Sequence, residues 1–430
     1  MSPLRSRCDA HRYDEIVAVE AVKKLDARAL RADFPVFEQE IHGRPLAYLD
    51  TAASSQKPRQ VLDQMRETYE HGYANVHRGV YELAERATEA YEGARLKVQR
   101  LLNAASRREV VFTRNVTYAM NLVAYAWGLP NLGPGDVVVV SELDHHAVFV
   151  PWQYVAGRTG ATFQVIPVDE GGELQLDALD EIAAAGRVRV VATNHVSNTL
   201  GTVNPVERLA VWAHEQGAIM IVDAAQSAPH RALDVQALGC DFLGFTSHKM
   251  CGPGGAGVLW GREELLAAME PFETGGEMIS SVTVEGTSWN ELPYKFEAGT
   301  PAIVEVVGLG TAIDYLEGIG FDAISAHEHE LTAYALERLG ELSWVRIFGP
   351  PLDRRAGIVS FEVEGVHPHD VAQILDRHGV AIRAGHHCTQ PLMRRLGVPA
   401  TNRASFYLYT IPEEIDQLVE GLHGVRKVFA

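Results

Sequence analysis

The sequence has few cysteines and lacks any block of basic residues. Its four cysteines in 430 residues are too few and too scattered for a disulfide framework or a CxxC zinc site: Cys8, Cys240, Cys251 and Cys388. The net charge is −18, and no local run of Lys and Arg offsets it. This charge excludes nucleic acid and anionic lipid as expected partners. We therefore expect a protein of a reducing compartment, in which any functional cysteine is a single reactive thiol.

Export and membrane signals are also absent. Residues 1–12 are polar, and Asp14 and Glu15 follow before any apolar core of a signal peptide could form. The longest uncharged window, residues 115–135, contains two prolines and three glycines, which suit a helix, a turn and a loop. These absences predict a cytoplasmic protein without membrane association.

Short apolar runs alternate with helical patterns between residues 110 and 245. Near-continuous Val, Ile and Leu runs separated by helices predict an α/β fold with a parallel sheet covered on both faces. A helical pattern over residues 58–102, with a break at 71–75, precedes this region. Strands are expected at 110–112, 136–140, 161–167, 188–193, 218–222 and 242–245, with helices at 116–127, 176–185 and 205–216.

The rhythm changes after about residue 300, which predicts a second, smaller α+β domain. No repeat or low-complexity linker separates the two parts, so we expect them to pack closely. At the other end, residues 1–24 are expected to be a tail that runs into a helix. The expected C-terminal elements are a long helix over 305–339 with a break at 318–320, strands at 357–363 and 380–383, a helix at 368–378, a strand-like stretch at 406–409 and a final helix from Pro412.

A carboxylate and a lysine end two strands of the predicted sheet. Asp223 follows the strand at 219–222, and Lys249 follows the strand at 242–245. Ligands bind at the C-terminal ends of parallel strands, so both side chains reach the same edge of the sheet. A Schiff-base lysine and an aspartate that faces a pyridine nitrogen are what pyridoxal phosphate chemistry needs. The alternative is a surface lysine and an aspartate that happens to end a strand, and these two residues alone leave both open.

Two further segments fall near the same edge. Residues 113–117 lie between a strand and a helix, where free backbone N–H groups and the Thr117 hydroxyl can hold a phosphate. The Walker spacing is missing, so a nucleotide phosphate is not indicated. His145 and His146 follow the strand at 136–140, and an imidazole there could stack on an aromatic cofactor. Taken singly, both histidines could equally be capping or surface residues.

The smaller domain carries the reactive thiol that the composition allows. Cys388 follows His386 and His387 in a loop with a nearby Arg383, and such neighbours can favour the thiolate. Zinc binding is the rival interpretation, but adjacent histidines generally cannot both face one ion and no CxxC supports them, so we predict no metal. Arg403 could clamp a substrate carboxylate with its guanidinium, or it could be a surface arginine.

Seven segments of the sequence together resemble one known family, the SUF-type (group II) cysteine desulfurases, from about residue 30 to the C-terminus. These enzymes are fold-type I pyridoxal phosphate proteins of the class V aminotransferase superfamily. The loop at 383–388, with its arginine, glycine, paired histidines and cysteine, is the most specific part of the resemblance. The segments are residues 31–35, 46–50, 76–79, 222–226, 247–249, 296–301 and 383–388.

The resemblance implies a domain organisation as well as a fold. A large, mainly parallel seven-stranded sheet domain that binds pyridoxal phosphate would be joined to a smaller α+β domain that carries the cysteine loop. The implied divisions are an N-terminal extension over 1–24, a segment over 25–44 that packs with the small domain, the large domain over 45–303 and the small domain over 304–430.

The same resemblance implies a role for each matching residue. Lys249 would hold the cofactor covalently and later move the Cα proton, with His145 stacked on the ring, and Cys388 would accept sulfur. The remaining roles would be Asp223 at the pyridine nitrogen, Gln226 at the ring hydroxyl, Val116, Thr117, Thr246 and His248 around the phosphate with Thr300 from the other subunit of a homodimer, Asn198 and Arg403 at the substrate carboxylate, and His77 and Arg383 at the entrance.

The implied activity is the conversion of L-cysteine to L-alanine with a persulfide left on Cys388. A small sulfur-acceptor protein would then take the sulfur for iron–sulfur cluster assembly or for a dedicated sulfur-transfer pathway. The alternatives on the same fold are a selenocysteine lyase, a C–S β-lyase or an epimerase, and further from it a non-catalytic scaffold or a zinc-binding module.

The sequence departs from the family pattern around the expected pocket. Val116 stands where alanine or a small hydroxyl residue is usual, and Tyr118 replaces a usual glutamate. None of these changes removes an implied chemical role, but their position bears on which substrate and pathway the pocket serves. The other departures are Val148, Ser247, Cys251, Gly254 and the segment 409–412.

Overall fold

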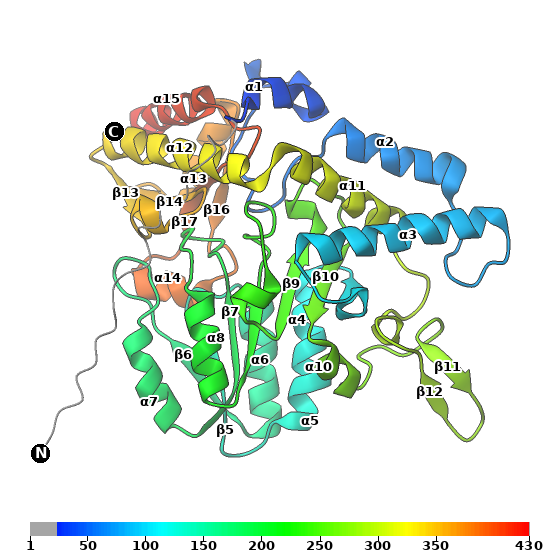
Figure 1. Ribbon diagram of the computed structural model, residues 1–430. Helices are drawn as coiled ribbons and strands as arrows, with labels where there is room; N and C mark the ends of the chain where they lie inside the picture. Colours follow the sequence, from blue (N-terminus) through cyan, green and yellow to red (C-terminus); the bar gives the residue numbers. More distant parts are fainter. Residues whose placement is uncertain (1–23, 430) are drawn as a thin grey trace, which may run out of the picture.

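A seven-stranded sheet forms the centre of the molecule, in the order β4-β10-β9-β8-β7-β5-β6 (Figure 1). The computed structural model describes residues 24–429, so the tail predicted for residues 1–24 lies almost entirely outside the described residues. Only β10 runs antiparallel to its neighbours, which confirms the predicted large, mainly parallel sheet. The strands are β4 (Val110–Thr113), β5 (Asp136–Ser141), β6 (Thr162–Ile166), β7 (Arg187–Asn194), β8 (Ile219–Asp223), β9 (Phe242–Thr246) and β10 (Gly257–Gly261).

Helices cover both faces of this sheet because its strands are apolar on both sides. In β5, Val137 and Val139 belong to one hydrophobic core while Val138 and Val140 belong to another, and all four are fully buried. One core is closed by α2 (Arg59–Glu67), α3 (Glu82–Leu101), α7 (Leu179–Ala184), α8 (Val206–Glu215), α9 (Val235–Leu238) and α11 (Ile303–Ile319), and the other by α4 (Val116–Val123), α6 (His146–Thr159) and α10 (Glu263–Ala268).

A second, four-stranded sheet lies beside the large one, at the upper left of Figure 1, in the order β13-β14-β17-β16. Ala47 and Leu49 pack into its hydrophobic core, and β3 (Ala47–Tyr48) pairs with β15 (Val380–Ala381). Tyr48 packs against a core of the large sheet, so the start of the predicted large domain at residue 45 contacts both cores. The other elements of this smaller part are β13 (Val345–Phe348), β14 (Ile358–Val363), β16 (Arg383–Gly385), β17 (Thr401–Ser405), α12 (Phe321–Gly340), α13 (Pro368–Arg377), α14 (Gln390–Leu396) and α15 (Pro412–Phe429).

One predicted strand is wrong. Residues 406–409 are not a strand. The strand in this region is β17, which contains Arg403 and ends at Ser405. Their aromatic side chains are buried for another reason: Phe406 packs in the core of the small sheet, whereas Tyr407 and Tyr409 pack in a core of the large one. The segment crosses the seam between the two sheets, and β-propensity alone does not distinguish this from a strand.

The predicted break in the long C-terminal helix is confirmed. α11 ends at Ile319 and α12 begins at Phe321, with Gly320 between them at φ +97°. That left-handed value favours glycine, because a Cβ would clash with the backbone there.

Small hairpins and a short helix complete the chain. β1 (Glu40–Ile41) pairs with β2 (Arg44–Pro45) after α1 (Ala27–Leu30), and α5 (Leu129–Asn131) precedes β5. The hairpin of β11 (Ile279–Val282) and β12 (Thr287–Trp289) projects from the body at the lower right of Figure 1.

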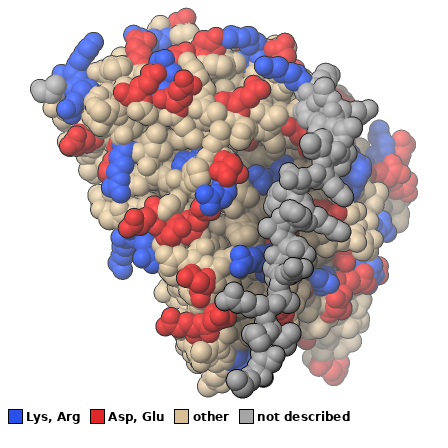
Figure 2. Space-filling model, turned by 60° about the vertical axis from the view of Figure 1, so that its left-hand side comes forward, with Lys and Arg blue, Asp and Glu red and all other residues tan. Residues whose placement is uncertain are grey.

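The surface carries charge of both signs. On the face shown in Figure 2, acidic and basic side chains are interspersed and no large basic patch is visible. None of the helices in the described part of the chain is long and apolar enough to cross a membrane.

Candidate active site

A cavity of about 280 Å³ lies where β8 and β9 end. Its volume is close to the lower end of the range found for small-ligand sites, about 300–1,000 Å³. It brings together most of the predicted site residues from both parts of the chain. The lining residues are Ala52, Ala53, Asn115, Val116, Thr117, His145, Asn198, Thr246, His248, Lys249, Arg383, His387, Cys388 and Arg403.

Lys249 lines this cavity, and Asp223 lies near Lys249 without lining the cavity itself. Lys249 ends the 3-10 turn that follows β9, and Asp223 is the last residue of β8. Burial lowers the pKa of Lys249 to about 8; the nearby Asp223 carboxylate opposes that shift, and Arg403 adds to it. An amine with such a pKa is partly neutral near physiological pH, so it can attack an aldehyde.

Asp223 is held as an acceptor. Burial raises its pKa, while a 2.9 Å hydrogen bond from the Ala225 N–H to Oδ1 and the charge of Lys249 act in the opposite direction. A carboxylate placed in this way can pair with a protonated ring nitrogen.

Several buried polar atoms in and beside the cavity have no partner within the described residues. They are Asn198 Oδ1, Gln226 Oε1, Thr246 Oγ1 and Arg403 Nε. Leaving such atoms unpaired costs free energy, about 1–3 kcal/mol each, so a polar ligand that satisfies them gains by binding. At the N-terminus of α4, the side chain of Asn115 caps the Tyr118 N–H at 2.9 Å, and the first N–H groups of the helix face the region where Val116 and Thr117 line the cavity. The residues present therefore fit pyridoxal phosphate, which has an aldehyde, a pyridine nitrogen, a hydroxyl and a phosphate.

His145 is neutral and fixed. Its Nδ1 accepts a 3.0 Å hydrogen bond from the Ala147 N–H at the start of α6, so the ring proton is on Nε2. Burial, followed by the charge of Lys249, lowers the pKa of His145 to about 3. A neutral imidazole in the cavity wall can stack on an aromatic ring without adding a positive charge.

The Cys388 loop has an unusual backbone. His387 and Cys388 both adopt positive φ values, +50° and +58°, which non-glycine residues rarely do. Three contacts hold the loop: the Cys388 N–H donates to His386 Nδ1 at 3.2 Å, the His146 N–H donates to the Cys388 carbonyl at 2.8 Å, and Asn198 Nδ2 donates to the His387 carbonyl at 2.7 Å. The sulfur-bearing residue is thus fixed by residues of both parts of the chain.

One of the paired histidines, His387, is neutral and so does not favour the Cys388 thiolate by its charge. His387 is buried, its Nε2 lies 3.0 Å from Thr401 Oγ1, and burial lowers its pKa to about 3, so it is neutral. The positive groups that line the cavity with Cys388 are instead Arg383, Arg403 and Lys249. No group of His, Cys, Asp and Glu residues able to hold a metal ion is found within residues 24–429.

The sequence interpretation missed Asp50, which holds both arginines of the site. Asp50 Oδ2 accepts from Arg383 Nη2 at 3.1 Å, and Oδ1 accepts from Arg403 Nη2 at 3.1 Å. Arg403 is only 2% exposed, so Asp50 is the counterion of a buried charge. The available signal was the one used for Asp223, since Asp50 also follows a short apolar run, residues 46–49.

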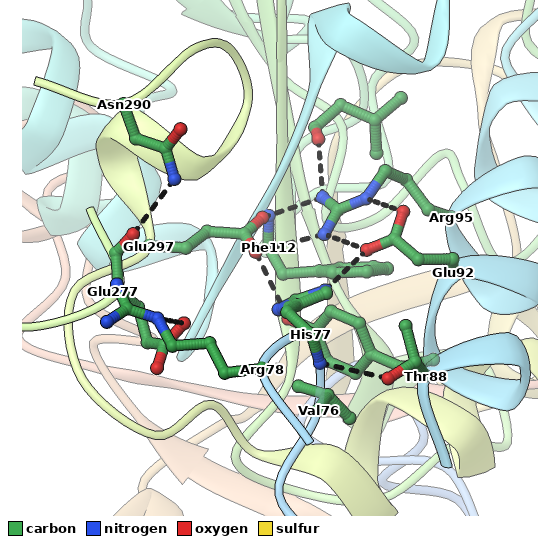
Figure 3. Close-up of polar contacts among 12 residues, drawn as sticks. Val76, His77, Arg78, Thr88, Glu92, Arg95, Phe112, Glu277, Asn290 and Glu297 are labelled. Carbon is green, nitrogen blue, oxygen red and sulfur yellow. Dashed lines mark hydrogen bonds and ion pairs between the residues drawn. The ribbon is translucent and has the colours of Figure 1, made fainter. Parts of the chain in front are cut away.

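His77 and Thr300 do not line this cavity. Figure 3 shows that His77 lies in a separate charged network, with Nε2 at 3.0 Å from Glu92 Oε1 and the Arg95 guanidinium beyond it. That network borders another hollow, of about 400 Å³. Thr300 lines a third hollow, of about 360 Å³. The predicted roles of Thr300, at the phosphate of the other subunit's site, and of His77, at the entrance, stay predictions.

Comparison with known proteins identifies the family. The class V aminotransferase family model matches residues 47–418. The chain is 51% identical over 405 residues to a probable cysteine desulfurase of Halalkalibacterium halodurans, covering 94% of this chain and 99% of that protein. It is 50% identical over 420 residues to a cysteine desulfurase of Haloferax volcanii, with 94% and 98% covered. The chain belongs to the cysteine desulfurase family.

Solved structures of family members have the same fold. The cysteine desulfurase of Thermococcus onnurineus superposes with a TM-score of 0.88 at 40% identity, over 93% of this chain and 98% of that one. The cysteine desulfurase CsdA of Escherichia coli gives a TM-score of 0.86 at 36% identity, over 94% and 99%. Class V aminotransferases are pyridoxal phosphate enzymes as a family, which agrees with the chemistry of the cavity residues.

Proposed function

We propose that this protein converts L-cysteine to L-alanine and takes the sulfur onto Cys388 as a persulfide. The observation that carries the proposal is that Cys388 and Lys249 line one cavity together with Arg403. Of the three cysteines in the described part of the chain, Cys388 alone is exposed. Burial raises the pKa of both Cys240 and Cys251 to about 12, so neither is an effective nucleophile near neutral pH.

Residues in and beside the cavity have proposed parts in binding. Lys249 would attach the cofactor, Asp223 would pair with its ring nitrogen, Gln226 would bind its hydroxyl and His145 would stack on its ring. Val116, Thr117, Thr246 and His248 would hold the phosphate. Arg403 and Asn198 orient the substrate carboxylate, and Arg383 lies at the half-exposed mouth of the cavity.

The chain's own residues then carry the reaction. Pyridoxal phosphate, when bound, supplies an electron sink that acidifies the Cα–H bond of the substrate. Lys249 Nζ accepts the Cα proton and returns a proton to the product. The Cys388 thiolate attacks the substrate sulfur, so that an S–S bond forms as the Cβ–S bond breaks, and its electron pair ends in a C–H bond of alanine. L-Cysteine and the Cys388 thiol thus become L-alanine and a Cys388 persulfide, with no external oxidant or reductant.

The finer assignments belong to the same proposal. We infer a homodimer of the SUF type, in which Thr300 serves the neighbouring subunit's site and His77 lies at the entrance, together with a small acceptor protein that removes the persulfide sulfur in the cytoplasm. Iron–sulfur cluster assembly and a dedicated sulfur-transfer pathway are both compatible users of that sulfur. L-Selenocysteine is the alternative substrate.

The test is to supply L-cysteine and a thiol reductant to the pyridoxal-phosphate-loaded protein and to quantify alanine and sulfide. We expect both products from the parent and from Cys240→Ala, whose altered thiol is buried outside the cavity, and loss of both from Cys388→Ser. Pyruvate and ammonia in place of alanine, or undiminished alanine from Cys388→Ser, would overturn the proposal.

A further inference from the structure

One carbonyl group beside the active-site lysine is surrounded by hydrogen-bond donors. The carbonyl oxygen of His248, which belongs to the peptide that joins His248 to Lys249, accepts from the Ser55 N–H at 3.0 Å and from Ser54 Oγ at 3.0 Å. Ser55 Oγ lies 3.2 Å from the same oxygen, and Lys57 Nζ lies 3.0 Å from it. A carbonyl oxygen has two lone pairs, so this arrangement supplies more donors than one acceptor ordinarily uses.

Lys57 is a half-buried lysine that the proposed reaction does not use. Its ammonium also contacts the Ser55 carbonyl and, at 3.5 Å, Ser54 Oγ. Within residues 24–429, no carboxylate oxygen lies within 4 Å of it, and burial lowers the pKa of Lys57 to about 8. Removing an ammonium even partly from water without a counterion costs free energy, and the groups that compensate Lys57 are oxygen atoms of Ser54, Ser55 and His248.

The segment 54–57 also binds the chain that follows Lys249. Ser55 Oγ accepts a 2.7 Å hydrogen bond from the Cys251 N–H, and Cys251 has a positive φ of +63°. Residues 54–57 therefore bind the chain both before and after Lys249. Lys249 itself ends the 3-10 turn Ser247–Lys249. The backbone is held while the Lys249 side chain remains in the cavity.

We propose that Lys57 is a positioning residue, which holds the His248–Lys249 peptide and so places the Lys249 amine toward its cofactor and substrate. The inference rests on the proposed role of Lys249. Lys57 acts through that peptide and does not itself line the cavity. The charge of Lys57 also reaches the cavity. After burial and the charge of Lys249, it helps to lower the pKa of His248, which lines the cavity.

The test compares Lys57→Met with the parent and with Lys97→Met, which removes a lysine of α3 that pairs with Asp314 of α11 and does not line the cavity. In the cofactor-free protein, we expect hydrogen exchange at the Ser55 and Cys251 amides to rise about tenfold or more in Lys57→Met, with the global unfolding midpoint unchanged or higher. A merely structural lysine would lower global stability instead.

The loaded protein gives a second readout. In Lys57→Met the pH midpoint of the visible absorbance of bound pyridoxal phosphate should move to higher pH, because a nearby positive charge is lost, and kcat for alanine formation should fall more than KM rises. Lys57→Gln keeps a shorter hydrogen-bond donor and should give an intermediate exchange rate at the Ser55 and Cys251 amides. This variant replaces Lys57→Met in the test if Lys57→Met does not fold.

Unchanged exchange at Ser55 and Cys251 together with an unchanged absorbance titration would overturn the inference. If the parent forms no alanine from cysteine, the proposed function fails, while exchange in the cofactor-free protein still decides whether Lys57 holds the turn.

Discussion

At the residue scale, the cavity depends on charges held close together, of which those of Lys249 and Arg403 are buried while that of Arg383 is exposed. Lys249, Arg403 and Arg383 share it, and the carboxylates that balance them are Asp223 and Asp50. Arg403 is buried, and its pKa is lowered by burial in spite of Asp50 beside it. Such a site favours an anionic ligand, because bound carboxylate and phosphate groups offset positive charge that the protein balances only in part.

The lowered pKa of Lys249 predicts how cofactor capture depends on pH. Only the neutral amine attacks an aldehyde, and the pKa of Lys249 is about 8 in place of the ordinary 10.5. We expect the rate of covalent attachment of pyridoxal phosphate to the cofactor-free protein to rise about tenfold per pH unit below pH 8 and to level off above it. Stopped-flow absorbance measures this rate.

The Asp223→Asn variant tests the same dependence of the attachment rate on the pKa of Lys249. Asp223→Asn removes the carboxylate that raises the pKa of Lys249, so the plateau should begin at a lower pH in this variant. An attachment rate that still climbs between pH 9 and 10 in the parent would contradict the pKa argument.

At the scale of elements, the N-terminus of α4 is positioned by close backbone contact with β10. A Cβ on Gly257 would lie 2.6 Å from Asn115 Cα and 2.8 Å from the Asn115 carbonyl carbon. Asn115 caps α4 and lines the cavity, and a backbone cannot swing away as a long side chain can.

Gly257→Ala should therefore displace the start of α4. We expect the affinity for pyridoxal phosphate to fall about tenfold and the free energy of unfolding to fall by about 1–3 kcal/mol. Gly254→Ala is the control, since its Cβ would have no heavy atom within 4 Å. Equilibrium binding and chemical denaturation measure the two effects, and equal behaviour of the two variants would count against this view of α4.

Strands marked by a continuous apolar run could be predicted from the sequence. β8 and β9 are near-continuous apolar runs that end in Asp223 and in the turn of Lys249, so period and position sufficed to place both side chains at one edge of the sheet. The aromatic residues 406–409 were misassigned because a buried strand and a buried crossing segment have the same composition. β10 was not predicted, since its antiparallel pairing with β4 joins residues far apart in the chain.

At the scale of the whole molecule, a buried charge network ties together distant segments. Arg95 of α3 has no exposed side-chain surface, and its guanidinium binds Glu92, Glu297 and the Val110 carbonyl (Figure 3). Glu297 in turn accepts from the Phe112 N–H of β4 at 2.7 Å. Helix, strand and the segment that leads to Thr300 are thereby joined at one point.

Arg95→Met should be strongly destabilising because it leaves two carboxylates without their buried partner. We expect the free energy of unfolding to fall by about 3–5 kcal/mol. Arg100→Met on the same helix removes an exposed ion pair with Glu317 and should cost no more than about 1 kcal/mol. Urea denaturation measures the free energy of unfolding of both variants. Similar decreases in the two would show that the Arg95 network contributes little to stability.

Contacts between segments far apart in the chain could not be predicted from the sequence. Asp50 and Arg383 are separated by 333 positions, and Lys57 and His248 by 191. The local pattern around one member of either pair does not indicate the other member, because each contact depends on the folded arrangement of distant segments. Cys388 could be identified as the reactive thiol, but the arginines and the lysine that surround it could be placed only by the fold.

The central claim is that sulfur passes from L-cysteine to Cys388, and mass spectrometry of the protein after one turnover tests it most directly. The loaded protein would be mixed with L-cysteine without a reductant, then digested and analysed peptide by peptide. We expect a gain of one sulfur atom on the peptide that contains Cys388 and none on those with Cys240 or Cys251. Alanine formed while Cys388 gains no sulfur would contradict it.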